Sequence, residues 1–300
     1  MNLLRLPSLI QEEILKSFSF SDIFLLSLCS RRAMQIAQLY SPKVLETSFD
    51  SQNGDIGVVM VYLGKSGKTR GFMARMDTIP ESLLETSNPF EVEIFGVNVV
   101  FCHPFSIFPT ISLTENNNGK EIGAIGNYLS LLFGTKIDNR LKMFYDFPEN
   151  ILSIPPAVTD VIIHGGNNSI RAEILERVYS NFPFSNSSYI VPNIQGKLRE
   201  DSHIFEIQHL HLLNAFWQTT DILYHFKGKT VTLYEAKCRE SAIIHFVEKW
   251  ISNEEFQNME WIKIKMNEDF RLNPEKIFKN FVTRRWEPME RPDTYSMKSL

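Results

Sequence analysis

The chain has 300 residues, of which 43% are hydrophobic and 22% are charged, and its formal net charge at pH 7 is −4. This composition is typical of a globular protein with a substantial core and excludes a disordered chain. Without a surplus of basic residues the chain lacks the electrostatic footprint that DNA or RNA binding requires, and it has no run of like charges that would attract a membrane surface. We therefore expect neither nucleic acid nor membrane as a direct partner.

The cysteines and the N-terminal residues bear on where the protein resides. Cys29, Cys102 and Cys238 are odd in number and far apart, so they provide neither a disulfide framework nor a CxxC metal pair. The apolar residues near the N-terminus are interrupted by charged ones, which a signal peptide excludes from its apolar region: Arg5, Glu12, Glu13 and Lys16. We expect an intracellular protein, in the cytoplasm, the nucleus or both.

Three helices are expected before Pro42, over residues 9–18, 21–28 and 30–39. Ser8, with Gln11 three residues later, has the pattern of a capping box for the first helix, and Ser21 is the expected start of the second. The second helix is apolar nearly all round, and so small a module cannot bury all of its large side chains. Its surplus apolar face must meet either the rest of the chain or a second protein.

The order of these residues resembles the F-box over residues 3–40, on the basis of Leu6-Pro7, Ile14-Leu15, Phe18, Asp22 and the run from Leu26 to Arg32. The resemblance implies a three-helix module whose apolar face binds the adaptor Skp1 of cullin-RING ubiquitin ligases, and through Skp1 a cullin. The chain departs from the family where many F-boxes have a tryptophan, because residues 32–34 are Arg-Ala-Met. The residues that the resemblance places against the adaptor are Leu6, Pro7, Ile10, Ile14, Leu15, Phe18, Leu25 and Leu28.

Residues 57–69, GVVMVYLGKSGKT, end like a phosphate-binding loop. That loop needs a glycine five residues before Gly67, so that backbone amides can surround the phosphates, and Tyr62 occupies this position. It also needs a helix that starts at Lys68, whereas the residues that follow are typical of a strand. We therefore expect a β-hairpin and no nucleotide.

Two further patterns indicate chemistry only in part. The stretch 158–166, VTDVIIHGG, is similar to the oxyanion loop of esterases, but the chain has no G-x-S-x-G nucleophile motif, so we expect a strand and then a helix capped by Asn168 or Ser169. His209 and His211 share one face of an expected strand, yet no third ligand is suitably spaced for zinc. We expect no catalytic residue, no cofactor and no metal.

Residues 94–113 contain no charged side chain over about the length that a bilayer requires. Pro104 and Pro109 interrupt this segment, and its first half is rich in valine and phenylalanine, as buried strands are. We therefore expect a strand, a turn and a second extended segment instead of a membrane span.

From residue 205 onward, short alternating runs are separated by segments with helical spacing. The alternating runs are centred on residues 210–212, 231–233 and 262–264, and residues 161–163 fit the same scheme. Units of about two to three dozen residues are typical of irregular leucine-rich-like repeats with parallel strands. We expect Trp217 and Trp250 in the core.

The same stretch resembles the type 2 F-box-associated domain of the F-box proteins that are expanded in nematodes. The resemblance is strongest over residues 200–270, and it lies in Trp217, Ile222-Leu223 and the segments KTVTLYE, FVEKWIS and MEWIKIKM. It implies a domain that binds a target protein behind the F-box.

The sequence therefore predicts an α+β protein with a three-helix F-box module at 1–42, an α/β domain with leucine-rich-repeat-like strand-helix units at 43–285 and a flexible tail at 286–300. The expected function is that of a non-catalytic substrate-recognition subunit of an SCF-type ubiquitin ligase, which binds Skp1 and an unknown target protein. The alternative is a hydrolase or nucleotide-binding enzyme with a helical N-terminal cap.

Overall fold

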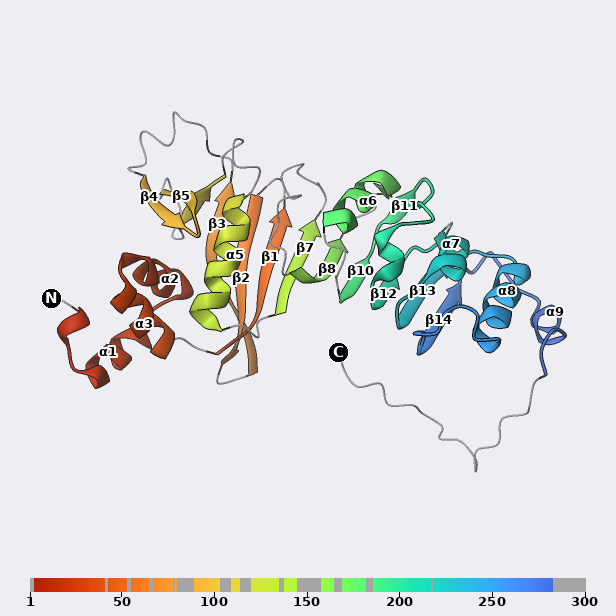
Figure 1. The fold of residues 1–300 in the computed structure, drawn as a ribbon, viewed down its shortest axis with the longest axis horizontal. Helices are drawn as coiled ribbons and strands as arrows, with labels where there is room; N and C mark the ends of the chain where they lie inside the picture. The colour runs from red at the N-terminus through yellow and green to blue at the C-terminus, as the bar shows by residue number, and fades with distance from the viewer. Residues whose placement is uncertain are drawn as a thin grey trace, which may run out of the picture.

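The computed structural model describes residues 3–40, 43–52, 55–64, 67–77, 79, 89–102, 109–113, 120–134, 138–144, 158–164, 169–181, 186–216 and 218–282. Three helices at the N-terminus precede a long mixed sheet, which within these residues has twelve strands (Figure 1). The α+β class is therefore confirmed.

The helices are α1 Ser8–Leu15, α2 Phe20–Cys29, α3 Arg31–Tyr40, α5 Lys120–Phe133, α6 Ala172–Asn181, α7 Gln218–His225, α8 Glu240–Ile251 and α9 Pro274–Phe278, with short 3-10 turns at Leu3–Arg5 and His203–Glu206. The strands are β1 Val44–Gln52, β2 Asp55–Gly64, β3 Gly67–Asp77, β4 Phe90–Ile94, β5 Val97–Cys102, β6 Thr110–Ser112, β7 Asp138–Phe144, β8 Val158–His164, β9 Ser169–Arg171, β10 Ser187–Ile190, β11 Asn193–Gln195, β12 His209–Leu212, β13 Thr230–Ala236 and β14 Trp261–Met266. The small strands β9 and β11 pair apart from the main sheet.

The start of α1 differs from the prediction. Pro7 is its N-cap residue and makes no side-chain cap hydrogen bond, so the expected capping box of Ser8 and Gln11 is wrong. Gln11 Nε2 instead donates to the carbonyl oxygen of Leu3 at 3.2 Å, which ties the helix to the preceding turn. The helix also ends at Leu15, three residues earlier than expected.

The caps of α2 and α3 have clear sequence signals. Ser19 and Asp22 form a capping box, in which each side chain satisfies a backbone N–H at the helix start, so α2 begins at Phe20 instead of residue 21. In α3 the hydroxyl of Ser30 accepts from the N–H of Ala33 at 3.1 Å. The three predicted helices are confirmed, with shifts of a few residues at their ends.

Strands β2 and β3 form the predicted hairpin. Their antiparallel pairing continues as far as the pair Gly64 and Gly67, and Lys68 and Thr69 belong to β3. No helix starts at Lys68, so the geometry of a phosphate-binding loop is absent from this part of the described chain. Residues 65–66, at the tip of the hairpin, lie outside the described residues.

The second half of the sheet consists of parallel strands that pair in chain order, β7-β8-β10-β12-β13-β14. The chain returns from β8 to β10 through α6, from β12 to β13 through α7, and from β13 to β14 through α8. Each strand-helix unit buries its apolar side against its neighbours, as in solenoid proteins. This confirms the predicted strand-helix units.

The two faces of the parallel strands differ. In β12, Leu210 and Leu212 are at most 1% exposed and belong to the core, whereas His209 and His211 point to the other face and are half-buried. We call this second face the open face and define it by Arg140, Lys142, Phe144, Asp160, Ile162, His164, Ser187, Tyr189, His209, His211, Thr230, Thr232, Tyr234, Trp261, Lys263 and Lys265. Figure 1 shows helix α5 lying across strands β1–β3.

The uncharged segment 94–113 forms strands, as predicted. The 94–113 segment is extended in β5 and β6, and no helix among the described residues is long and apolar enough to cross a membrane.

Helix α6 starts at Ala172 after strand β9, so a cap at Ser169 is wrong. Trp250 is 37% exposed and not a core residue, because Phe246 and Phe256 fill that part of the core. Residues 168, 217 and 286–300 lie outside the described residues.

The start of β13 depends on a close backbone approach at Gly228. An added Cβ there would lie 1.9 Å from the carbonyl oxygen of Ile207, whereas a Cβ at Gly123 in α5 would meet nothing within 4 Å. We expect Gly228→Ala to lower the free energy of unfolding by about 1–3 kcal/mol, and the control Gly123→Ala to raise it by about 0.5–1 kcal/mol. Urea unfolding followed by circular dichroism measures both, and equal stabilities would contradict the close approach.

Candidate interaction surfaces

The surplus apolar face of α2 is covered largely by the chain itself. Phe20, Ile23 and Phe24 are at most 7% exposed and belong to the same core as the sheet. The Phe20 ring packs edge-on against Tyr62 at 4.8 Å, and an added Cβ at Gly71 of β3 would come within 2.6 Å of it. The absence of a side chain at Gly71 therefore makes room for this helix on the sheet.

Two buried hydrogen bonds fix α2 in place. The hydroxyl of Ser21 donates to the carbonyl oxygen of Met73 in β3, and the Tyr128 hydroxyl of α5 donates to Ser27 Oγ at 3.0 Å. Burial raises the pKa of the Tyr128 hydroxyl, which keeps it protonated as a donor at neutral pH. The opening helices thus pack on the β3 side of the sheet instead of standing apart from it.

Large apolar side chains remain exposed on the other two opening helices. On α1, Leu9 is 69% exposed and Ile10 is 46% exposed, and on α3 Leu39 is 75% exposed. The Tyr40 hydroxyl donates to the carbonyl oxygen of Ser8 at 3.3 Å, which joins the end of α3 to the start of α1. Leu9 and Leu39 were not among the predicted contacts, and the signal for Leu9 was its position off the apolar face of α1.

The structure divides the residues predicted to contact the adaptor. Pro7 and Ile10 are exposed, and Leu15 is 2% exposed inside the helical module. The others are partly exposed, and three of them also pack against the core shared with the sheet: Phe18, Leu25 and Leu28, whereas Leu6 and Ile14 do not belong to that core.

A cavity of about 540 Å³ lies between α1–α2 and strands β2–β3. Its lining is mainly apolar and aromatic, with Lys16 at its edge. Its polar lining consists of Lys16, Ser19, Tyr40 and Tyr62, and among the described residues that line it there is no histidine, cysteine or carboxylate.

One row of side chains on the open face is dominated by paired charges. Arg140 lies opposite Asp160 in the register, and Asp160 lies opposite Ser187. The guanidinium of Arg140 is 3.0 Å from a Glu46 carboxylate oxygen and 3.5 Å from one of Asp160, and the Ser187 hydroxyl donates to Asp160. In the next row Lys142, only 7% exposed in its side chain, lies 3.6 Å from Asp50.

A row of rings crosses four parallel strands beside these charges. Phe144 stacks on His164 at 5.0 Å with an interplanar angle of 10°, and Tyr189 lies 6.2 Å from both His164 and His211. A shallow pocket of about 360 Å³ opens over Tyr189, His164, His211 and Arg140. The arrangement provides ring faces for stacking and imidazole nitrogens for hydrogen bonds.

The histidines of the open face are neutral at pH 7. Burial lowers the pKa of His164, His209 and His211, and the nearby cations Lys142 and Lys229 lower the pKa of His164 and His209 further. His209 Nδ1 is 2.8 Å from Thr230 Oγ1.

No metal centre is formed by the part of the chain that the structure describes. Within it, no group of three or more histidine, cysteine, aspartate or glutamate side chains is arranged to hold an ion. All three cysteines are free, and burial raises the pKa of the Cys238 thiol to about 11, which keeps it from acting as a nucleophile at neutral pH.

These pKa shifts predict a pH dependence of stability. A histidine with a lower pKa in the folded than in the unfolded protein binds fewer protons when folded, so stability falls as the pH drops below about 6.5. We expect the urea midpoint to decrease from about pH 7.5 to about pH 5.5, and His164→Asn with His211→Asn to reduce this decrease. His245→Asn, on α8, is the control, and an equal pH dependence in all three proteins would show that the open-face histidines do not cause it.

Comparison with known proteins agrees with the helical N-terminus. Residues 3–44 match the F-box domain family. The chain is also similar to "Uncharacterized protein F59B2.8" of Caenorhabditis elegans, with 21% identity over 293 residues that cover 96% of this chain and 65% of that protein. The chain thus spans slightly less than two thirds of that relative's length, and the type 2 F-box-associated domain stays a prediction. The F-box predicted for the opening residues is confirmed, and residues 3–44 are an F-box domain.

Proposed function

We propose that this protein is a substrate-recognition subunit of an SCF-type cullin-RING ubiquitin ligase. The observation that carries the proposal is the F-box match over residues 3–44. It is supported by Leu9 and Ile10, which leave two large apolar side chains of α1 available for contact with a partner. Through these helices the protein binds a Skp1-like adaptor, and through the adaptor a cullin.

The proposed division of labour follows the two parts of the chain. The F-box at 1–42 holds the adaptor, and the α/β domain at 43–285, as a type 2 F-box-associated domain, holds a target protein. The protein itself catalyses nothing and works inside the cell, in the cytoplasm, the nucleus or both. It contributes proximity, because a tethered target meets the ubiquitin-loaded subunit at a high effective concentration.

The proposed adaptor surface centres on α1. Pro7 and Ile10 are its exposed members, Leu9 is added to them, and Leu6 and Ile14 are partly exposed. The buried Leu15 acts as internal support for this surface. The remaining predicted contacts use the part of each side chain that the sheet does not cover: Phe18, Leu25 and Leu28.

Truncation of the exposed side chains of α1 tests this proposal. We expect Leu9→Ala with Ile10→Ala to weaken binding of purified Skp1 by at least about tenfold, because burying a leucine-sized side chain contributes about 1.5–3 kcal/mol and these two start largely exposed. Isothermal titration calorimetry measures the affinity, and circular dichroism verifies that the helices persist.

The matched control is Ile251→Ala, which removes a side chain that is 70% exposed on α8, far from the F-box in sequence. It should leave Skp1 binding unchanged. Undiminished binding by the α1 double variant would place the adaptor surface elsewhere. An unmutated chain that does not bind Skp1 would overturn the proposed function.

A further inference from the structure

The open face changes character at its β14 end. In β14, Ile262 and Ile264 pack against the core, so Lys263 and Lys265, which alternate with them, lie on the open face and are exposed. The register places Lys263 beside Thr232 of β13, and Thr232 lies beside His211 of β12. Lys263 therefore continues the row of side chains that contains Tyr189 and His211, and Lys265 lies one row further along the same face.

These lysines have no carboxylate partner among the residues that the structure describes. Lys263 Nζ lies 5.4 Å from the centre of the Tyr234 ring and 3.4 Å from its hydroxyl, so an aromatic residue and not an acid holds it. At the other end of the face, Arg140 and Lys142 are each paired with carboxylates. The positive charge is thus compensated near β7 and uncompensated at β14.

The side chains between the two ends add no negative charge. The open-face positions of β10, β12 and β13 are occupied by serine, tyrosine, histidine and threonine. Three acids lie near this part of the face: Glu260, which precedes β14, Glu235, which accepts from the Asn267 amide, and Asp160, which Arg140 and Ser187 hold. Glu235 lies in the bulge of β13 opposite Lys265, but its carboxylate bonds to Asn267 and forms no ion pair with either lysine among the described residues.

Lysines on an edge strand also have a simpler role, because they prevent unwanted pairing with other strands. Protection of an edge strand does not depend on which side chains of the neighbouring strands lie on the same face as the lysines. Here Lys263 lies in one row with Thr232 and His211, on the same face as the Tyr189 ring and the pocket over His211, and its ammonium group lies over the Tyr234 ring. A surface that combines uncompensated cations with ring faces is complementary to acidic residues interspersed with aromatic ones.

We propose that the open face of β10, β12, β13 and β14 binds an acidic segment of the target protein. The carboxylates of that segment meet Lys263 and Lys265, and its aromatic side chains lie over Tyr189 and the neighbouring pocket. This inference rests on the proposed function, since it names the class of segment that the target-binding domain holds.

The test uses the full chain and two fluorescein-labelled synthetic peptides, one of alternating glutamate and tyrosine and one of alternating lysine and tyrosine. We expect the glutamate peptide to bind, as fluorescence anisotropy reports, and the lysine peptide not to bind. Lys263→Glu with Lys265→Glu should weaken the glutamate peptide by at least about tenfold, whereas the arginine pair at the same positions should retain its affinity.

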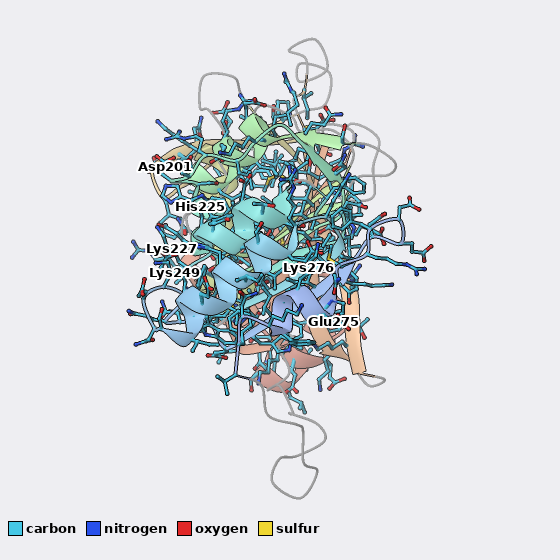
Figure 2. The ribbon with its side chains drawn as sticks, turned by 90° about the vertical axis from the view of Figure 1, so that its right-hand side faces the viewer. Asp201, His225, Lys227, Lys249, Glu275 and Lys276 are labelled. Carbon is cyan, nitrogen blue, oxygen red and sulfur yellow. The ribbon has the colours of Figure 1, made fainter. Side chains whose placement is uncertain are left out.

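The matched control is Lys227→Glu with Lys276→Glu, which changes the net charge by the same amount. Figure 2 shows both lysines at the end of the molecule formed by α7–α9. An equal loss of affinity in the control pair, no loss in the β14 pair, or preference for the lysine peptide would each overturn the inference. Skp1 binding measured on the same proteins separates the two proposals, because it tests the F-box and does not involve β14.

Discussion

The packing of Phe20 on the glycine at position 71 is the contact on which the arrangement of the two surfaces depends. It seats α2 on β3, and the buried bonds from Ser21 and Tyr128 lock the helix there. Because the apolar side of α2 packs against the sheet, the largely exposed apolar side chains of the opening helices lie on α1 and α3. The F-box therefore shares a common core with the sheet, and this core would hold an adaptor bound to α1 in one orientation relative to the sheet.

The open face follows from the strand order. Parallel strands that pair in chain order return through helices, and right-handed crossovers place those helices on one side of the sheet. Because side chains alternate along each strand, leucine, isoleucine and valine point to the helix-covered face, and histidine, tyrosine and lysine point to the open face. The geometry that stabilises the core thus also creates a polar surface on the other side, and at one end of this surface Arg140 and Lys142 are paired with carboxylates.

Local patterns predicted the helices, the hairpin and the parallel units, because each depends on the period of the side chains within one segment. Local patterns failed where a second segment of the chain provides another partner for the same side chain. Ser8 and Gln11 have the spacing of a capping box as Ser19 and Asp22 do, but Gln11 bonds to the preceding turn. Trp250 has the helical spacing of a core residue and its ring lies 5.6 Å from Phe246, yet it remains 37% exposed, because Phe256 from the following turn packs closer on Phe246 at 4.7 Å. The row of rings was beyond prediction, because it depends on the register between four strands.

The uncompensated lysines of β14 and the F-box lie toward opposite ends of the sheet. From β3, which carries α2, to β14 the sheet order contains eight strand-to-strand steps. At about 4.8 Å a step, this places β14 on the order of 40 Å from the F-box side, and Figure 1 shows α1–α3 and β14 toward opposite ends of the long axis. A target held at β14 would then stand clear of an adaptor held at α1, with a continuous hydrogen-bonded sheet between them. Such a spacer fixes the distance between the two partners, and a ligase that transfers ubiquitin to a tethered lysine requires that distance to be defined.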